Sequence, residues 1–411
     1  MALPECVVES IAVGGAGVGR LEDGRVVFIE GVVPGERVAV ELYEERKRFA
    51  KGSVAAVLEA SPTRSNPACV EVARGCGGCG WAHIHHSEQL ALKASMVEQA
   101  LGRIGKIAAP EIAHAEPLAR TGFRTTLRAA VVDGQAALRQ ARSQTPVMID
   151  GCLVAHPLIE ALLTEGRFGD ATEVTLRVGA RTGDQMVITN GDPQTCDLPD
   201  GVLVVSARPV GRAGITEERA GITEGRAGIT ERVLGSLFEI SPGSFFQTRA
   251  DGADQLVELV SDGLRQAYGQ VPARLVDLCA GVGLFGALIE ATEVVAVESN
   301  RSAVQDAMSN LQRLRPPGTS KVVKSTVERW RPESAQVVVA DPSRVGLKAS
   351  GVAAVVATGC EVVALVSCDA GSLGRDAGLL VEAGYSLDRL TLVDLFPDTP
   401  RIEAVSILSR R

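Results

Sequence analysis

Apolar and polar residues alternate in three different ways along the chain, and these patterns divide it into three regions. In residues 1–60, short β-type runs are separated by Gly- and Pro-containing turns, which predicts an OB-like β-barrel or a small sandwich. In residues 61–240, a helical pattern is followed by a series of β-type segments, which predicts a β-rich central domain. In residues 241–411, apolar runs alternate with helical patterns, which is typical of an α/β domain with a largely parallel sheet.

The central region contains one long helical pattern and one internal repeat. The helix is predicted at residues 87–104, with an apolar face that we expect to pack on the α/β domain and that comprises Leu90, Val97, Leu101 and Ile104. Residues 212–232 repeat a seven-residue unit three times, RAGITEE, RAGITEG and RAGITER. Each unit has a glycine and only one isoleucine, which argues against a coiled coil and favours a surface hairpin or a mobile loop. We assign this repeat no function.

A nucleotide-binding pattern lies at residues 273–300. The apolar run Leu275–Cys279 ends in a turn that contains Gly281 and Gly283, a helical pattern follows, and a second apolar run ends on Glu298. Strand, Gly-rich turn, helix and strand form the first half of a doubly wound nucleotide-binding sheet. The glycines allow the backbone to approach a ligand, and Glu298 is placed to accept hydrogen bonds from a ribose diol. Dinucleotides and S-adenosylmethionine both fit this pattern.

Two further strand ends of the α/β region carry polar or reactive side chains, Asp341 and Cys368. Ligands of an open α/β sheet bind outside the carboxyl ends of its strands, so both residues are expected near the cofactor. A cysteine that ends a strand is by itself more often a small core residue than a nucleophile. Its position in the same sheet as the Gly-rich turn favours a nucleophilic Cys368.

A cysteine motif, CVEVARGCGGCGW, begins the central region. Cys69, Cys76 and Cys79 are separated by six and two residues, which suits a single small metal centre, and Cys152 is the best candidate for a fourth ligand. Zinc and an iron–sulfur cluster both remain open on spacing. A Cys₃His zinc site is a further alternative, with its histidine drawn from His83, His85 and His86.

Composition limits the function without naming it. The chain has 45% hydrophobic and 22% charged residues and a formal net charge of −8, which is ordinary for a globular protein and argues against a wholly basic nucleic-acid binder. Local basic surfaces remain compatible with it, at Arg46-Lys47-Arg48 with Lys51 and at arginines with strand spacing, although solvated faces explain both clusters equally well. We expect a cytoplasmic monomer without a membrane segment, because no export signal or long apolar run is seen.

Several motifs together resemble known families. IAVGGAGVGRLEDGRVVFIEGVVPGERV resembles a TRAM domain, a β-barrel that binds RNA. ISPGSFFQT, VDLCAGVGLF, VVAVES, VVVADPSRVGL, LVSCDAGSLGRD and DLFPDTPRIEAVSIL occur in the order and spacing of the RNA uracil-C5 methyltransferase family, whose iron–sulfur members carry a leading TRAM domain and a four-cysteine cluster. The resemblance implies a class I methyltransferase fold in residues 241–411. It also implies transfer of the S-adenosylmethionine methyl group to C5 of a uridine in tRNA or rRNA.

The resemblance also implies roles for individual residues. Cys368 matches the nucleophile that adds to C6 of uracil, and Glu403 matches the base that removes the C5 proton. Phe245, Gln247 and Asp341 match positions that stack on or hydrogen-bond the target base. The positions expected at S-adenosylmethionine, including the strand end before the turn, are Gln247, Asp277, Cys279, Gly281, Gly283, Leu284, Glu298, Thr326 and Asp341. The positions expected at the metal centre are Cys69, Cys76, Cys79 and Cys152, and here the resemblance favours [4Fe–4S] over zinc.

The chain departs from the family pattern at several positions. Asp369-Ala370 follows the nucleophile where Asn-Pro is usual, Arg401 takes the place of a histidine, and Arg249, Leu284 and Thr326 take the place of asparagines. These changes spare Cys368 and Glu403 but put the substrate preference in question. Three rival interpretations are an NAD-dependent oxidoreductase, an RNA-binding protein that has lost catalysis, and an RNA cytosine-C5 methyltransferase. The first gives Cys368 and Glu403 no role, and the last does not need the DLFPDTPRIE motif.

Overall fold

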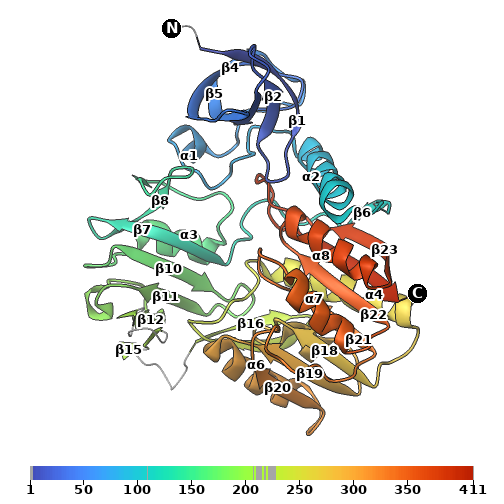
Figure 1. The fold of residues 1–411 in the computed structure, drawn as a ribbon. Helices are drawn as coiled ribbons and strands as arrows, with labels where there is room; N and C mark the ends of the chain where they lie inside the picture. The colour runs from blue at the N-terminus through green and yellow to red at the C-terminus, as the bar shows by residue number, and fades with distance from the viewer. Residues whose placement is uncertain are drawn as a thin grey trace.

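The computed structural model describes residues 3–108, 110–206, 208–209, 215–216, 219–220 and 228–410, so that most of the predicted loop at residues 212–232 lies outside it. Three regions follow one another along the chain (Figure 1). Among the described helices, none has the length and apolar character needed to cross a membrane.

The N-terminal region is a closed β-barrel, which confirms the prediction of an OB-like fold. Its strand order is β1-β2-β3-β5-β4. The strands are β1 (Glu5–Ile11), β2 (Gly17–Arg20), β3 (Val26–Glu30), β4 (Arg37–Glu45) and β5 (Phe49–Glu59). Alternate residues such as Val27, Ile29 and Val38 point inward and are fully buried, as the two-residue period of a strand requires.

The central region is built on a mixed sheet of order β15-β12-β11-β10-β7-β8-β9, covered by α3 (Pro157–Glu165). Its strands are β7 (Thr126–Val132), β8 (Gln135–Arg139), β9 (Pro146–Val147), β10 (Glu173–Val178), β11 (Gln185–Thr189), β12 (Leu203–Ser206) and β15 (Arg219–Ala220). Shorter elements are α1 (Val70–Ala73), the 3₁₀-turn η2 (Pro193–Thr195), the pair β13 (Arg208–Pro209) and β14 (Ile215–Thr216), and the hairpin β16 (Ile229–Val233) and β17 (Ser236–Ile240).

The C-terminal region is a class I methyltransferase-like sheet of order β20-β19-β18-β21-β22-β24-β23-β6. The first five strands are parallel, as predicted, and β24 runs antiparallel to both of its neighbours. The strands are β18 (Arg274–Leu278), β19 (Glu293–Glu298), β20 (Ser320–Lys324), β21 (Val337–Ala340), β22 (Val362–Ser367), β23 (Tyr385–Leu392) and β24 (Ala404–Arg410). The eighth strand, β6 (Ile112–His114), comes from the central region and pairs with β23. The sequence around this short strand has no apolar pattern that predicted it.

Helices cover both faces of this sheet. One apolar cluster includes α4 (Ala250–Tyr268) and α5 (Leu284–Leu288), beside α6 (Arg301–Leu314). The other includes α7 (Lys348–Ala357), α8 (Ala370–Glu382) and α2 (His86–Ala100) of the central region. The end of α2 continues as a π-turn, η1 (Leu101–Gly105), which lies against α8.

Glycines allow this close approach between α2 and α8. A Cβ on Gly374 would lie 2.4 Å from the carbonyl oxygen of Ala100, and a Cβ on Gly378 would lie 2.6 Å from that of Gly105. The predicted apolar face of the helix is partly wrong, because Ile104 is 47% exposed, whereas Gln89 and Lys93 are buried.

Candidate active site

The Gly-rich turn follows β18 and adopts a left-handed backbone. Cys279, Gly281 and Gly283 have φ values of 59°, 54° and 85°. The conformation costs a non-glycine residue on the order of 1 kcal/mol, which Cys279 bears and the glycines do not. A Cβ on Gly281 would have only the Phe245 carbonyl oxygen near it, at 4.0 Å, so the turn is open on that side. A ligand can therefore approach the backbone there.

Glu298, at the end of β19, is hydrogen-bonded to the backbone of the turn. Its Oε2 accepts a hydrogen bond from the Gly281 N–H at 2.9 Å, and its Oε1 accepts from Ser299 N–H and Asn300 N–H at 2.6 and 2.7 Å. Each carboxylate oxygen has two lone pairs, so one lone pair of Oε2 remains for a hydroxyl donor. This geometry suits the predicted contact with a ribose diol.

The other predicted cofactor residues lie around the turn in different roles. Asp277 is fully buried, its Oδ2 accepts from Gly286 N–H at 2.8 Å, and burial together with the charges of Asp341 and Glu298 raises its pKa to about 7. Leu284 lies in the apolar core and offers only shape. Thr326 is exposed in the turn after β20. Burial is the main cause that raises the pKa of Cys279 to about 12, and the charges of Glu298, Asp341, Asp277 and, least of all, Glu328 add to it. The structure thus brings Asp277, Cys279, Glu298 and Asp341 together, whereas the side chain of Leu284 is buried in the apolar core.

Cys368 and Glu403 face each other across neighbouring strands. Ser367 of β22 pairs with Ala404 of β24, so Cys368, one residue later, lies opposite Glu403, one residue earlier. Burial raises the pKa of the Cys368 thiol to about 11, with the charges of Glu403 and Asp341 acting in the same direction and Arg344 opposing them. The predicted nucleophile and base are therefore adjacent, although 34 residues separate them in the sequence.

Glu403 is buried, and one of its two carboxyl oxygens has no hydrogen-bond partner among the described residues. The residue is 3% exposed, and the unpartnered oxygen is Oε1. Burial and the charge of Asp341 raise its pKa well above the usual value for a glutamate. A carboxyl group whose pKa is raised holds a proton more strongly than an ordinary glutamate, which favours proton transfer to and from it.

The predicted base-reading residues lie beside this pair. Gln247 Nε2 donates to Asp341 Oδ2 at 3.3 Å, and burial raises the pKa of Asp341 to about 7. Phe245 is 64% exposed, in contrast to the buried Phe246, so its ring is available to stack on a base. This segment is held in place by two buried side chains that the sequence did not single out: Arg177 donates to the Ser244 carbonyl at 2.9 Å, and Asp306 accepts from Ser241 N–H at 2.8 Å.

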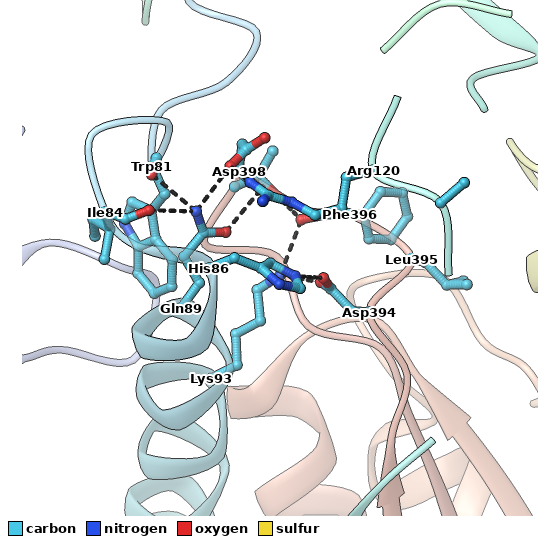
Figure 2. Close-up of polar contacts among 12 residues, drawn as sticks. Trp81, Ile84, His86, Gln89, Lys93, Arg120, Asp394, Leu395, Phe396 and Asp398 are labelled. Atoms are coloured by element: carbon cyan, nitrogen blue, oxygen red, sulfur yellow. Dashed lines mark hydrogen bonds and ion pairs between the residues drawn. The ribbon is translucent and has the colours of Figure 1, made fainter. Parts of the chain in front are cut away.

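A polar network that the sequence analysis missed fixes the loop that leads to Glu403 (Figure 2). Lys93 Nζ donates to Asp394 Oδ1 at 2.6 Å and to the Phe396 carbonyl at 2.9 Å, and His86 Nε2 lies 2.7 Å from Asp394 Oδ2. Gln89 donates to Asp398 Oδ1 at 2.9 Å and accepts from Asp398 N–H at 2.8 Å. The available signal was three polar residues at helical spacing, 86, 89 and 93, on one side of a helix.

We expect Lys93→Met to lower the free energy of unfolding by about 3 kcal/mol, because it leaves the partly buried Asp394 carboxylate without its main counter-charge. Denaturant unfolding measures the effect. The double variant Lys93→Met, Asp394→Leu should recover part of the loss, since it removes the stranded charge. If the two single changes and the double change were simply additive, Lys93 and Asp394 would not be coupled in this way.

The four predicted metal ligands line one cavity of about 550 Å³, between the cysteine motif, β7–β8 and the loop after β23. Burial raises the pKa values of Cys76, Cys79 and Cys152, and the four thiols lie within electrostatic reach of one another around Cys79. As the described side chains stand, no three His, Cys, Asp or Glu groups are gathered closely enough to hold a metal ion. The cavity is nevertheless lined by four thiols, the donor set of a cubane cluster.

The histidines offered as zinc ligands are mostly engaged elsewhere. His83 Nε2 lies 3.3 Å from the Val32 carbonyl oxygen, and His86 pairs with Asp394. Of the described histidines that line the cavity, His85 alone has no hydrogen-bond or ion-pair partner for its ring. This arrangement weakens the Cys₃His alternative.

Two of the departures from the family pattern have structural roles. Arg249 is 1% exposed, stacks 4.2 Å from the ring of Phe123 and donates to the Ala119 carbonyl at 2.8 Å, so it joins the central region to the sheet. Asp369 caps α8 by accepting from Ser372 N–H at 2.8 Å, a favourable role for aspartate. Both side chains therefore have partners within the protein.

Comparison with known proteins gives concordant matches over different lengths. A TRAM domain model matches residues 7–55. An uncharacterised RNA methyltransferase of Streptomyces avermitilis is 32% identical over 98% of this chain and 97% of its own. The 23S rRNA (uracil(1939)-C(5))-methyltransferase RlmD of Edwardsiella ictaluri is 31% identical over 96% of this chain and 92% of its own. The fold is similar to the tRNA (uracil-54, C5)-methyltransferase of Pyrococcus abyssi in complex with S-adenosyl-L-homocysteine, with a TM-score of 0.73, 22% identity, and coverage of 98% and 99% of the two chains.

Proposed function

Since the chain belongs to the RNA methyltransferase family that includes the 23S rRNA (uracil(1939)-C(5))-methyltransferase RlmD, we propose that it methylates C5 of a uridine in rRNA or tRNA, with S-adenosylmethionine as the methyl donor. The observation that carries the proposal is the pairing of Cys368 with Glu403 across β22 and β24, beside Asp341. A thiol, an acid of raised pKa and a base-reading amide at one site are the groups that C5 methylation of uracil needs.

In the proposed reaction Cys368 first acts as a nucleophile. Its thiolate forms an S–C6 bond with uracil, and the electron pair of the C5=C6 bond moves toward the O4 carbonyl, which makes C5 nucleophilic. Gln247 and Asp341 are placed to hydrogen-bond the edge of the ring during this step. S-adenosylmethionine, when bound, supplies the methyl group that C5 takes up.

Glu403 then completes the reaction. Its carboxylate accepts the proton from C5, the electrons of the broken C5–H bond restore the C5=C6 bond, and the C6–S bond breaks to return Cys368 as a thiolate. The proton remains on Glu403 and must leave to solvent before the next turnover. Phe245 supports this chemistry by offering a stacking surface for a base that has left its helix.

For the cofactor, the same proposal assigns the open side of the Gly281 turn and the remaining lone pair of Glu298 Oε2. The left-handed turn presents backbone rather than side chains to a ligand, and Glu298 is oriented by three backbone N–H groups toward the same region. Asp341 acts electrostatically on both Cys279 of the turn and Cys368, and Gln247 donates a hydrogen bond to Asp341, so cofactor and base would meet beside these two side chains.

The test is transfer of label from methyl-labelled S-adenosylmethionine to bulk tRNA and rRNA purified from cells that lack the protein. Label recovered as 5-methyluridine would support the proposal and identify the RNA. With the cofactor bound normally, absence of label from both RNAs would favour an RNA-binding protein that has lost catalysis. Label in 5-methylcytidine would point to the cytosine enzyme instead.

We further propose that Cys69, Cys76, Cys79 and Cys152 hold a [4Fe–4S] cluster, with zinc as the less favoured occupant. The support is a donor set of four thiols around one cavity, on segments tied together by Glu71, which accepts from Asp150 N–H at 3.1 Å. Protein reconstituted without oxygen should bind about four irons, as a cluster requires, and absorb in the visible range, and Cys79→Ser should lose both signals. One equivalent of zinc with no visible absorption would refute the cluster.

A further inference from the structure

One side of α6 is polar and buried, and it contacts both the cofactor part and the base-reading part of the candidate active site. Asn310 is fully buried and Asp306 is 6% exposed. The two residues are four positions apart, so they lie on the same side of the helix. Asp306 contacts the segment that leads to Phe245, and Asn310 contacts both that segment and the Gly-rich turn. The helix therefore joins two parts of the site that are distant in the sequence.

Asn310 makes the connection with a single side chain. Its Oδ1 accepts from the Glu239 N–H at 2.9 Å, and its Nδ2 donates to the Glu239 carbonyl at 3.1 Å. The same Nδ2 donates to the Val282 carbonyl, in the Gly-rich turn, at 3.0 Å. An asparagine amide has two N–H donors and an acceptor oxygen, and all of them are used here. The end of β17 and the turn are thus hydrogen-bonded to one buried amide.

The chain between β17 and Phe245 is attached to the same helix. Asp306 Oδ2 accepts from the Ser241 N–H at 2.8 Å and also from the Ser244 hydroxyl. A Cβ on Gly281 would lie 4.0 Å from the Phe245 carbonyl oxygen, so this segment passes beside the Gly-rich turn. The separation between Phe245 and the turn is therefore set by the contacts that both make with α6.

This separation matters for the proposed reaction. Methyl transfer requires the donor methyl group and the acceptor carbon to be held about 3 to 3.5 Å apart and aligned before they react. In the proposed function the Gly-rich turn holds the donor, whereas Phe245 and Gln247 hold the acceptor base. An error of about 1 Å in such an arrangement can slow the reaction about 10²-fold, even when its cause lies away from the reacting atoms.

We propose that Asn310 is a positioning residue for methyl transfer, which fixes the Gly-rich turn against the segment that carries Phe245 and Gln247. The inference rests on the proposed function. Because Asn310 is fully buried, it acts through the backbone groups of Glu239 and Val282. It aligns the donor with the acceptor, whereas addition of Cys368 to the base does not depend on it.

The test uses Asn310→Asp, which keeps the size of the side chain and an acceptor for the Glu239 N–H but has no N–H for the Val282 carbonyl. Val260→Ala is the matched control for a general loss of stability, since Val260 is a fully buried residue of α4 in the same domain. Both variants are compared with wild type below their melting temperatures. Val260→Ala should be less stable but keep its reaction rates within about 2-fold of wild type.

The first readout compares methyl transfer with exchange of tritium from C5 of the target uridine. With S-adenosyl-L-homocysteine in place of the donor, Cys368 can add to C6 and C5 can take a proton from solvent. Loss of the tritium as an ion to Glu403 then restores the C5=C6 bond and expels the thiolate. Asn310→Asp should slow methyl transfer about 10²-fold but change tritium exchange less than about 3-fold. An equal loss of both rates would mean a merely structural role and would overturn the proposal.

A second readout needs no reaction. Hydrogen exchange of the Glu239 N–H is measured with and without S-adenosyl-L-homocysteine. A ligand on the turn should slow this exchange at least about 5-fold in wild type, because Asn310 connects Glu239 to Val282, and less than about 2-fold in Asn310→Asp. Equal slowing in the two proteins would refute the connection. The expected difference, in a protein that transfers no label, would uphold the connection while the proposed reaction fails.

Discussion

Cys368→Ala is expected to abolish methyl transfer, with a loss of about 10⁴-fold or more, because without the S–C6 bond C5 of uracil is not nucleophilic enough to accept the methyl group. The same variant should form no covalent RNA adduct. The side chain is half-buried at the end of β22 and makes no hydrogen bond to another described side chain, so binding of RNA and cofactor should change by less than about 2-fold. Labelled methyl transfer and denaturing gels measure the two effects.

Cys196→Ala is a suitable control, because Cys196 is another half-buried free thiol and belongs to the central region, not to the C-terminal sheet that carries Cys368. It should retain wild-type turnover. If Cys368→Ala instead transferred methyl groups at the rate of Cys196→Ala, the covalent route would be wrong. Another mechanism for activating C5 would then be required.

Glu403→Gln is expected to reduce turnover by about 10²- to 10⁴-fold while the protein accumulates as a methylated covalent adduct with RNA. The first half of the reaction needs only the Cys368 thiolate, whereas release needs a carboxylate to remove the C5 proton. An adduct that survives denaturation and carries the labelled methyl group is the signature. Glu361→Gln, an exposed glutamate before β22, should behave as wild type.

The pH dependence follows from the raised pKa values. Glu403 acts in its ionised form and Cys368 in its thiolate form, and the pKa of each is raised in the RNA-free protein, so kcat/KM should climb as pH rises through neutral into alkaline values.

The raised pKa of Glu403 has the opposite effect on the stability of the fold, which falls as pH rises. A carboxyl whose folded pKa is raised contributes stability at low pH that is lost as pH rises through that pKa, so Glu403→Gln should be at least as stable as wild type at pH 8.

Release of product by Glu403→Gln at the wild-type rate would exclude Glu403 as the base. Asp341 would then be the next residue to test, because its pKa is raised to about 7 and it acts electrostatically on both Cys368 and Glu403. If Glu403→Gln were unfolded at pH 8, in contrast, its loss of activity would have a structural cause. The melting temperature distinguishes this outcome from a catalytic one.

Local patterns in the sequence were sufficient to predict the architecture. The alternation at residues 1–60 predicted the barrel, and the buried runs that end at Leu278, Glu298, Ala340 and Ser367 predicted the parallel strands of the sheet. These predictions succeeded because burial of one strand or helix face imposes a short-range period on the sequence. The prediction for the helix face around Ile104 failed, because polar side chains occupy the buried side of α2 and contact a loop some 300 residues later.

What the sequence by itself determined was which residues end the strands of the sheet, and hence which side chains reach its ligand edge. Only the tertiary structure decided that Cys368 lies opposite Glu403, that β6 completes the sheet, and that Lys93 and Gln89 hold the catalytic loop. It also decided which arginines around the cysteine cavity are paired with acids. Strand register and ion pairing depend on distances between segments far apart in the chain, and no local period in a single sequence encodes those distances.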